Sequence, residues 1–107
     1  MSKNYLLKLF VTGQTPRSEL AIGNLRRICE EEFQNEYELI VIDVLRRPQL
    51  AEDEKILATP TVIKELPPPI RRIIGDLSEK AKVLLGLDLV GQDMANKQSN
   101  KKPGRQK

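Results

Sequence analysis

The sequence contains no histidine and no tryptophan, and its only cysteine is Cys29. Without histidine, neither a Ser-His or Cys-His catalytic pair nor a histidine metal site can form. A single cysteine excludes an intramolecular disulfide and a Cys-x-x-Cys redox pair. We therefore expect a protein that is not an enzyme and that binds no cofactor and no metal ion.

Long hydrophobic runs are also missing. The longest unbroken apolar run is Leu39–Ile42, far short of the ~20 residues that a membrane-spanning helix needs. Near the N-terminus the apolar stretch Tyr5–Leu7 ends at Lys8, so we expect no signal peptide. The 107 residues, 39% of them hydrophobic, are enough for one globular domain. The sequence predicts a small cytoplasmic protein that makes no membrane contact.

Acidic residues are scarce only at the C-terminal end. Residues 93–107 contain five basic residues and one acidic residue, which leaves residues 1–92 with a net charge of −1. The end has almost nothing to bury, so we expect a domain over residues 1–92 and a disordered basic tail over residues 93–107. The tail has no aromatic residue that could stack on a base, which makes nucleic acid a poor candidate partner.

The first half of the chain has clear local patterns. Residues 5–11 are mostly apolar and predict a strand, and Thr15 and Pro16 are typical of the N-cap and first position of a helix. Apolar residues at spacings of three and four follow, with Cys29 among them, which indicates a buried structural thiol. The β-branched run in residues 37–44 predicts a second strand covered on both faces, which completes a βαβ unit.

The chain after residue 57 is compatible with two arrangements. In the first, a short helix begins at Pro48 and ends at about Leu57, and a strand begins at Pro60. A triple proline then leads to an antiparallel strand over residues 71–74. A last helix, capped by Ser78, then ends near Gly86. The resulting order is βαβαββα.

In the second arrangement, residues 61–66 and 70–74 form two short helices and residues 82–90 form a strand, which gives the order βαββααβ. The same apolar residues suit a period of 2 and, less well, a period of 3.6. Local preference therefore leaves both α/β arrangements open, and such conflict is typical of a frustrated sequence.

The string Thr59-Pro60-Thr61 resembles the threonine–cis-proline turn of thioredoxin-like folds. The position of the redox motif in that fold holds Thr12–Pro16, which includes no thiol. The resemblance implies the fold and not the oxidoreductase activity.

Longer strings resemble the KaiB family of cyanobacterial circadian clock proteins over about residues 5–89. They include Val41–Leu45, Pro48–Glu52, Lys55–Thr61, Leu66–Pro69, Arg71–Ser78 and Gly86–Leu89. The resemblance implies a metamorphic protein that rests as a homotetramer or dimer in the βαββααβ arrangement. It also implies a rare monomer in the thioredoxin-like arrangement that binds partners.

The resemblance implies a non-enzymatic regulator that joins the N-terminal lobe of the KaiC ATPase ring. The assembly would sequester KaiA and displace the sensor kinase SasA. In physical terms, two packings of similar free energy coexist, and a partner that binds one of them shifts the population toward it.

Site residues follow from the resemblance one position at a time. The residues that match the refolding region are Pro60, Pro67, Pro68, Pro69, Gly86 and Asp88. Tyr37 and Lys55 match positions near the partner surface. Their simpler interpretations are a packing residue at a strand edge for Tyr37 and a solvated cation for Lys55.

Four features depart from the family pattern: Ile40 replaces a lysine, Leu20 a basic residue and Gly91 an aromatic one, and the tail is basic where an acidic tail is usual. These departures favour a divergent paralogue that serves a different KaiC-like ring and does not engage KaiA. The alternatives are a thioredoxin-like adaptor or stress-response protein, and a redox protein that uses Cys29 alone.

Overall fold

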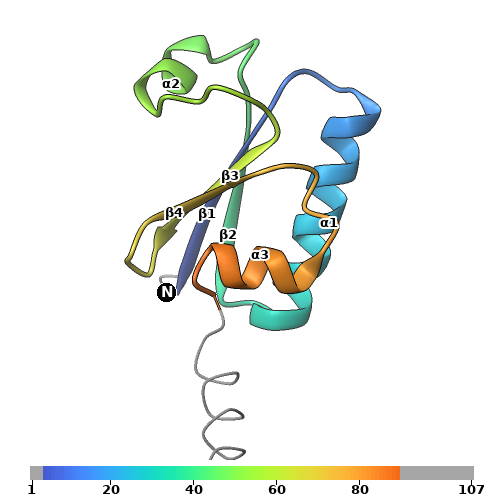
Figure 1. The fold of residues 1–107 in the computed structure, drawn as a ribbon, viewed down its shortest axis with the longest axis vertical. Helices are drawn as coiled ribbons and strands as arrows, with labels where there is room; N and C mark the ends of the chain where they lie inside the picture. Colours follow the sequence, from blue (N-terminus) through green and yellow to red (C-terminus); the bar gives the residue numbers. More distant parts are fainter. Residues whose placement is uncertain (1–3, 90–107) are drawn as a thin grey trace, which may run out of the picture.

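The elements follow one another in the first of the two predicted orders, βαβαββα (Figure 1). The computed structural model describes residues 4–89. Within this range the elements are β1 (Tyr5–Val11), α1 (Pro16–Phe33), β2 (Tyr37–Asp43), α2 (Pro48–Asp53), β3 (Thr61–Leu66), β4 (Arg71–Ile74) and α3 (Lys80–Gly86). The chain is thus an α/β protein of thioredoxin-like order.

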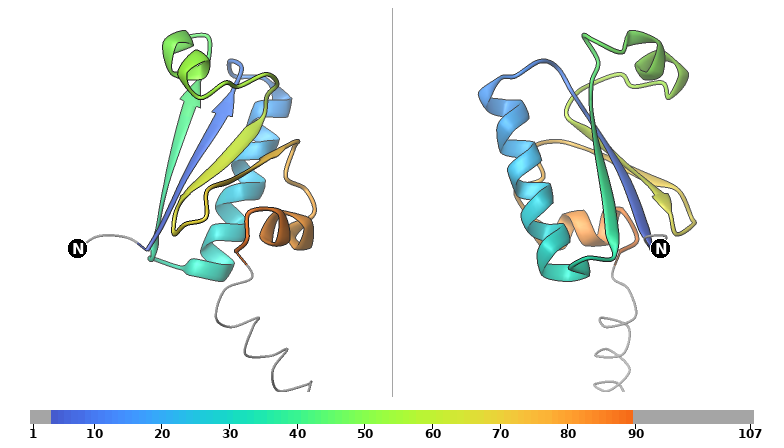
Figure 2. Two further views of the ribbon diagram at one scale, coloured as in Figure 1. Left: turned by 60° about the vertical axis from the view of Figure 1, so that its left-hand side comes forward. Right: turned by 180° about the vertical axis from the view of Figure 1, so that it is seen from behind.

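The strands form one mixed sheet in the order β2-β1-β3-β4. Strand β1 pairs in parallel with β2 and antiparallel with β3, which pairs antiparallel with β4. Helices α1 and α3 cover one face of the sheet, and α2 lies over one end of the opposite face (Figure 2). The two inner strands β1 and β3 are therefore covered best, and Leu7 and Leu9 of β1 and Val62 of β3 are fully buried.

Helix α1 begins as its sequence predicts. The Thr15 hydroxyl oxygen accepts a hydrogen bond of 3.1 Å from the Ser18 N–H, and Pro16 occupies the first helical position. The predicted apolar stripe faces the sheet, and Cys29 is buried within it.

The core has two parts, one on each face of the sheet. The larger part lies between the sheet and helices α1 and α3. The smaller part consists of Phe10, Ile42 and Ile63, with Leu50 of α2 packed against it. Because the six residues of α2 extend only ~9 Å and a seven-residue strand ~23 Å, α2 leaves much of its face open.

Helix α3 ends at Gly86, as the sequence predicts, whereas α2 ends earlier than predicted. Helix α2 ends at Asp53 and not near Leu57, because Lys55 adopts a left-handed conformation with φ 55°. Gly86 is the last residue of α3 and does not follow it; the left-handed residue beyond α3 is Asp88, with φ 59°.

Both ends have the hydrogen bonds of a Schellman motif. After α2, the N–H groups of Lys55 and Ile56 donate to the carbonyl oxygens of Glu52 and Ala51 over 3.0 and 2.9 Å. After α3, those of Asp88 and Leu89 donate to the carbonyl oxygens of Leu85 and Leu84 over 3.1 and 2.6 Å. Neither left-handed position holds the glycine from which such an ending is usually predicted.

The predicted cap of α3 is also wrong. The N-cap position is Glu79, and no side chain caps the helix. The Ser78 N–H instead donates to Asp76 Oδ1 over 3.0 Å, within the loop that leads from β4 to α3.

The predicted tail over residues 93–107, and Gly91 before it, lie outside the described residues. From residue 4 to residue 89, no helix has the length and apolar character needed to cross a membrane.

Candidate functional site

The prolines of the predicted refolding region lie at the two ends of β3. Pro60 is buried just before β3, its peptide bond with Thr59 is cis, and its carbonyl oxygen accepts the Gly75 N–H over 2.9 Å. The exposed triple proline Pro67, Pro68 and Pro69 connects β3 to β4. The structure thus places prolines on both sides of one strand and does not bring them together.

Gly86 lies where α3 approaches β4. A Cβ atom at this position would lie 2.5 Å from Cδ1 and 2.9 Å from Cγ1 of Ile73. Any larger residue at position 86 would therefore displace the Ile73 side chain. Gly86 permits the close packing of α3 on the sheet.

Asp88 lies near a residue that the sequence prediction missed. Lys64 of β3 is fully buried, and its Nζ has no hydrogen-bond partner in the part of the chain that the structure describes. Burial lowers the pKa of Lys64, the negative charge of Asp88 opposes this shift, and Arg71 reinforces it. Strand alternation could have identified Lys64, because it shares a face with the core residue Val62.

The two predicted partner-binding residues lie in different parts of the fold: Tyr37 is the first residue of β2, and Lys55 follows α2. The Tyr37 hydroxyl donates to Glu30 Oε2 over 2.6 Å, and this hydrogen bond is the main cause that raises the pKa of Tyr37 to about 12. Lys55 is exposed beyond α2, and its carbonyl oxygen accepts a 3.3 Å hydrogen bond from Arg72 Nη1. The two side chains therefore do not form one site.

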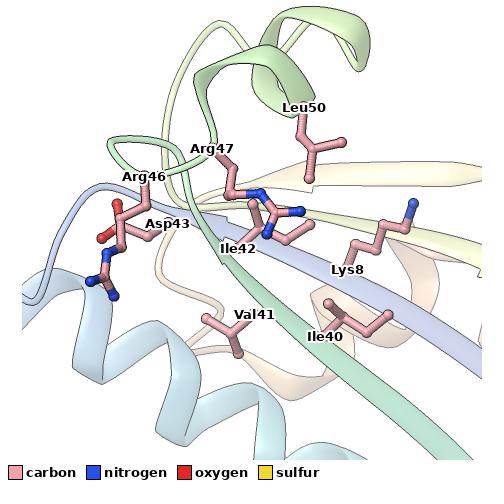
Figure 3. A pocket seen from close by; sticks show the side chains of 8 residues that line it. All are labelled: Lys8, Ile40, Val41, Ile42, Asp43, Arg46, Arg47 and Leu50. Carbon is pink, nitrogen blue, oxygen red and sulfur yellow. The ribbon is translucent and has the colours of Figure 1, made fainter.

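A groove of about 600 Å³ lies on the open face of the sheet, beside α2 (Figure 3). We call it the α2 groove. Its lining comes from β1, β2, α2 and the loop between β2 and α2: Lys8, Ile40, Val41, Ile42, Asp43, Arg46, Arg47 and Leu50. Sequence reasoning singled out only Ile40 among these residues, because the groove arises from elements that are distant along the chain.

The α2 groove has an excess of available positive charge. The side chains of Arg46 and Arg47 form no hydrogen bond or ion pair with any other described residue. Lys8 forms an ion pair of 3.1 Å with Glu65. Asp43 Oδ1 accepts the N–H groups of Gly13 and Leu45, each over 2.9 Å.

These two hydrogen bonds are the main causes that lower the pKa of Asp43, and its carboxylate thereby holds the loops beside the groove. Asp43 therefore has a structural role besides partly balancing the nearby Arg46.

The position of a thioredoxin redox motif carries no thiol in this structure. The hydroxyl groups of Thr12 and Thr59 lie 2.6 Å apart there. Cys29 is buried on α1, and burial together with the charge of Glu30 raises its pKa to about 12. A thiol with such a pKa is protonated near neutral pH and is a poor nucleophile. Over residues 4–89, no three acidic or cysteine side chains gather in a way that could hold a metal ion.

Comparisons with known proteins agree with this fold. The chain is 57% identical over 98 residues to the circadian clock oscillator protein KaiB of Microcystis aeruginosa, covering 92% of this chain and 94% of that one. It is 59% identical over 95 residues to the KaiB of a Cyanothece strain, covering 89% and 90% of the two chains.

Two solved structures have the same fold. The N-terminal domain of SasA from Synechococcus elongatus superposes with a TM-score of 0.68 and 29% identity over 87% of this chain and 90% of that one. Chloroplastic thioredoxin z superposes with a TM-score of 0.66 and 22% identity over 83% and 81% of the two chains. The family model of the KaiB domain matches residues 8–89 of this chain. With this match and the identities to clock proteins, the chain belongs to the KaiB family.

Proposed function

We propose that this protein is a non-enzymatic clock regulator that binds a KaiC-type ATPase ring in the βαβαββα arrangement. The observation that carries the proposal is the superposition of this arrangement on the N-terminal domain of SasA. Two proteins that share a fold can present equivalent surfaces to one partner and compete for it. Tyr37 and Lys55 are the proposed contacts with such partners.

A second part of the proposal is that the chain rests as a homo-oligomer in the βαββααβ arrangement and refolds to bind. Three features of the C-terminal third support a small free-energy difference: β4 has only four residues, α3 has seven, and Lys64 buries an unpartnered amine. The residues proposed to accommodate both arrangements are Pro60, Pro67, Pro68, Pro69, Gly86 and Asp88. A binding-competent state populated at ~1% would raise the apparent dissociation constant about a hundredfold.

Gel filtration of the purified chain with a KaiC ring, with ATP and without nucleotide, tests ring binding. We expect co-elution that develops over hours, because the competent state is rare. The ring alone and the chain alone serve as controls. Separate elution after prolonged incubation under both conditions would exclude the proposal.

The partners that act on the assembled ring are a further part of the proposal. Ile40 lies in the α2 groove, where many family members carry a lysine. An apolar residue at this position favours a partner set that differs from that of the clock relatives, without engagement of KaiA. A pull-down with KaiA, in the presence and absence of the ring, distinguishes the two cases: retention of KaiA would contradict this part alone.

A further inference from the structure

We infer that the α2 groove is a docking site for an acidic segment of a protein partner, one that places a carboxylate beside an apolar side chain. The inference shares one premise with the proposed function, namely that the molecule bound by this chain is another protein. It concerns a surface distinct from Tyr37 and Lys55.

The floor of the groove is apolar and partly exposed. Ile40 and Leu50 are half-buried, and Ile42 beneath them belongs to the smaller part of the core. Helix α2 is too short to cover this surface. A partner side chain that packed on Ile40 and Leu50 would extend the small core outward, and apolar burial of this kind is the main favourable contribution in most protein interfaces.

The rim of the groove specifies the charge of the occupant. Figure 3 shows the Arg47 side chain extending over the groove, between Leu50 and Lys8. The Arg47 side chain has no hydrogen-bond or ion-pair partner among the described residues, whereas Arg46 lies beside Asp43, which partly balances its charge (Figure 3). The carboxylates of Asp43 and Glu65 are already engaged. A guanidinium group binds a carboxylate through two parallel hydrogen bonds, so an acidic residue is the group that Arg47 fits best.

The groove is formed before any partner binds. Arg72 of β4 donates from Nη2 to the carbonyl oxygen of Glu54 over 2.9 Å and from Nη1 to that of Lys55 over 3.3 Å. These bonds tie the end of α2 to the far edge of the sheet, and Leu50 anchors the helix on the smaller core. A preformed site loses less conformational entropy on binding than one that must order itself.

The test is an NMR titration of the whole chain with short synthetic peptides, followed until the spectra no longer change. One peptide combines glutamate and leucine, a second replaces glutamate by glutamine, and a third replaces leucine by serine. We expect saturable shifts of the Ile40, Ile42 and Leu50 methyl groups with the first peptide only. Equal shifts with all three peptides, or shifts confined to other residues, would overturn the inference.

Matched charge reversals separate the groove from general electrostatics. Arg47→Glu should weaken binding of the Glu/Leu peptide about tenfold or more, whereas Arg17→Glu, an equal charge change on α1, should leave it within about twofold. Equal losses in both variants would contradict a groove-specific site. Methyl shifts of the same size with inorganic phosphate alone would identify an anion site without a peptide preference and would also overturn the inference.

Competition distinguishes failure of this inference from failure of the proposed ring binding. If the ring binds and the Glu/Leu peptide neither binds in the groove nor competes, the groove inference fails and the proposed function stands. If the peptide binds in the groove but the ring does not bind at all, the proposed function fails and the groove inference stands.

Discussion

At the scale of single residues, Lys64 is the least satisfied group in the described part of the protein. Its side chain is fully buried, and its amine lacks a hydrogen bond there. Asp88 offsets part of the cost of the buried charge, but at a distance beyond that of an ion pair, and Arg71 adds to the cost. A buried charge without a close partner destabilises the state that contains it.

Replacement of Lys64 by methionine should therefore stabilise this arrangement. Methionine retains the length and flexibility of the lysine stem and removes the charge. We expect the free energy of unfolding to rise by about 1–3 kcal/mol, the usual cost of an unsatisfied buried polar group. Chemical denaturation measures the change, with Lys82→Met as the control, because Lys82 is exposed on α3. A loss of stability on Lys64→Met would show that the amine is satisfied.

The same amine predicts a dependence of stability on alkaline pH. The pKa of Lys64 is lowered in the folded state, whereas the unfolded chain has the ordinary value of 10.5. Below its folded pKa the buried amine is charged and destabilises the folded state, and this penalty is relieved as pH rises from the folded pKa toward 10.5. The stability advantage of Lys64→Met over the natural chain should therefore shrink as pH rises toward 10.

The pH comparison uses two chains because other groups titrate in the same range. Both Tyr37 and Cys29 have pKa values raised to about 12 in the folded state, so their stabilising contributions are lost as pH rises above their unfolded values. These contributions are common to both chains and cancel in the difference. A difference that stays constant from neutral pH to about pH 10 would argue against a lowered pKa for Lys64.

At the scale of elements, two helices end at left-handed residues that are not glycine. Lys55 follows α2 with φ 55°, and Asp88 follows α3 with φ 59°. This conformation costs an L residue roughly 1–2 kcal/mol, which glycine avoids. The ends of α2 and α3 therefore contribute less stability than their hydrogen bonds alone would provide.

Substitution of Lys55 by glycine should stabilise the fold. The Lys55 side chain is exposed and forms no ion pair with any residue between 4 and 89, so its removal loses little. We expect a gain of about 0.5–1 kcal/mol in the free energy of unfolding, after allowance for the greater entropy of glycine in the unfolded chain.

Thermal unfolding measures the effect of Lys55→Gly, and Lys55→Ala is the matched control, because it removes the cation without easing the backbone. We expect the alanine variant to be no more stable than the natural chain. If both substitutions stabilised equally, the charge of Lys55 and not its conformation would be responsible. If Lys55 contacts the ring as proposed, both variants weaken ring binding while only glycine adds stability.

The elements also show what the sequence could and could not predict. Residues 5–11 and the start of α1 at Pro16 were predicted correctly, and the strand predicted over residues 37–44 ends one residue earlier. These elements have strong local signals: a β-branched run, a capping pair and a helical apolar period. The end of α2 was misplaced because Lys55 takes a left-handed conformation that is uncommon for lysine. The end of α3 near Gly86 was predicted correctly, although the left-handed residue that follows α3 is Asp88.

The candidate site was predictable only in part. The resemblance identified Gly86 and Asp88, but neither the contact of Gly86 with Ile73 nor the burial of Lys64 follows from spacing along the chain. Arg46 and Arg47 form no recognisable motif, and their relation to Lys8 and Ile40 exists only once β1, β2 and α2 have assembled. Sites of this kind arise from tertiary structure and leave no local pattern.

At the scale of the whole molecule, the described fold is one of two arrangements that the sequence predicts, and its stability relative to the other decides how much of it is available to a partner. Any substitution that stabilises only the βαβαββα arrangement enlarges its population. A change of 1.4 kcal/mol alters the ratio of the two states about tenfold. Residue-scale energies are therefore large enough to control the behaviour of the entire chain.

Lys64→Met should accordingly act as a population switch. If the βαββααβ arrangement exposes residue 64, the substitution favours the βαβαββα arrangement by about 1–3 kcal/mol, which raises a ~1% population to between about 5% and about 60%. NMR peak populations in the free chain should shift, and co-elution with the KaiC ring should develop faster and at lower concentration. Lys82→Met should change neither. Higher stability of Lys64→Met with unchanged peak populations would mean that the amine is buried equally in both arrangements. The free-energy difference between the two arrangements would then have to come from the packing of α3 through Gly86 and from the left-handed turn at Asp88.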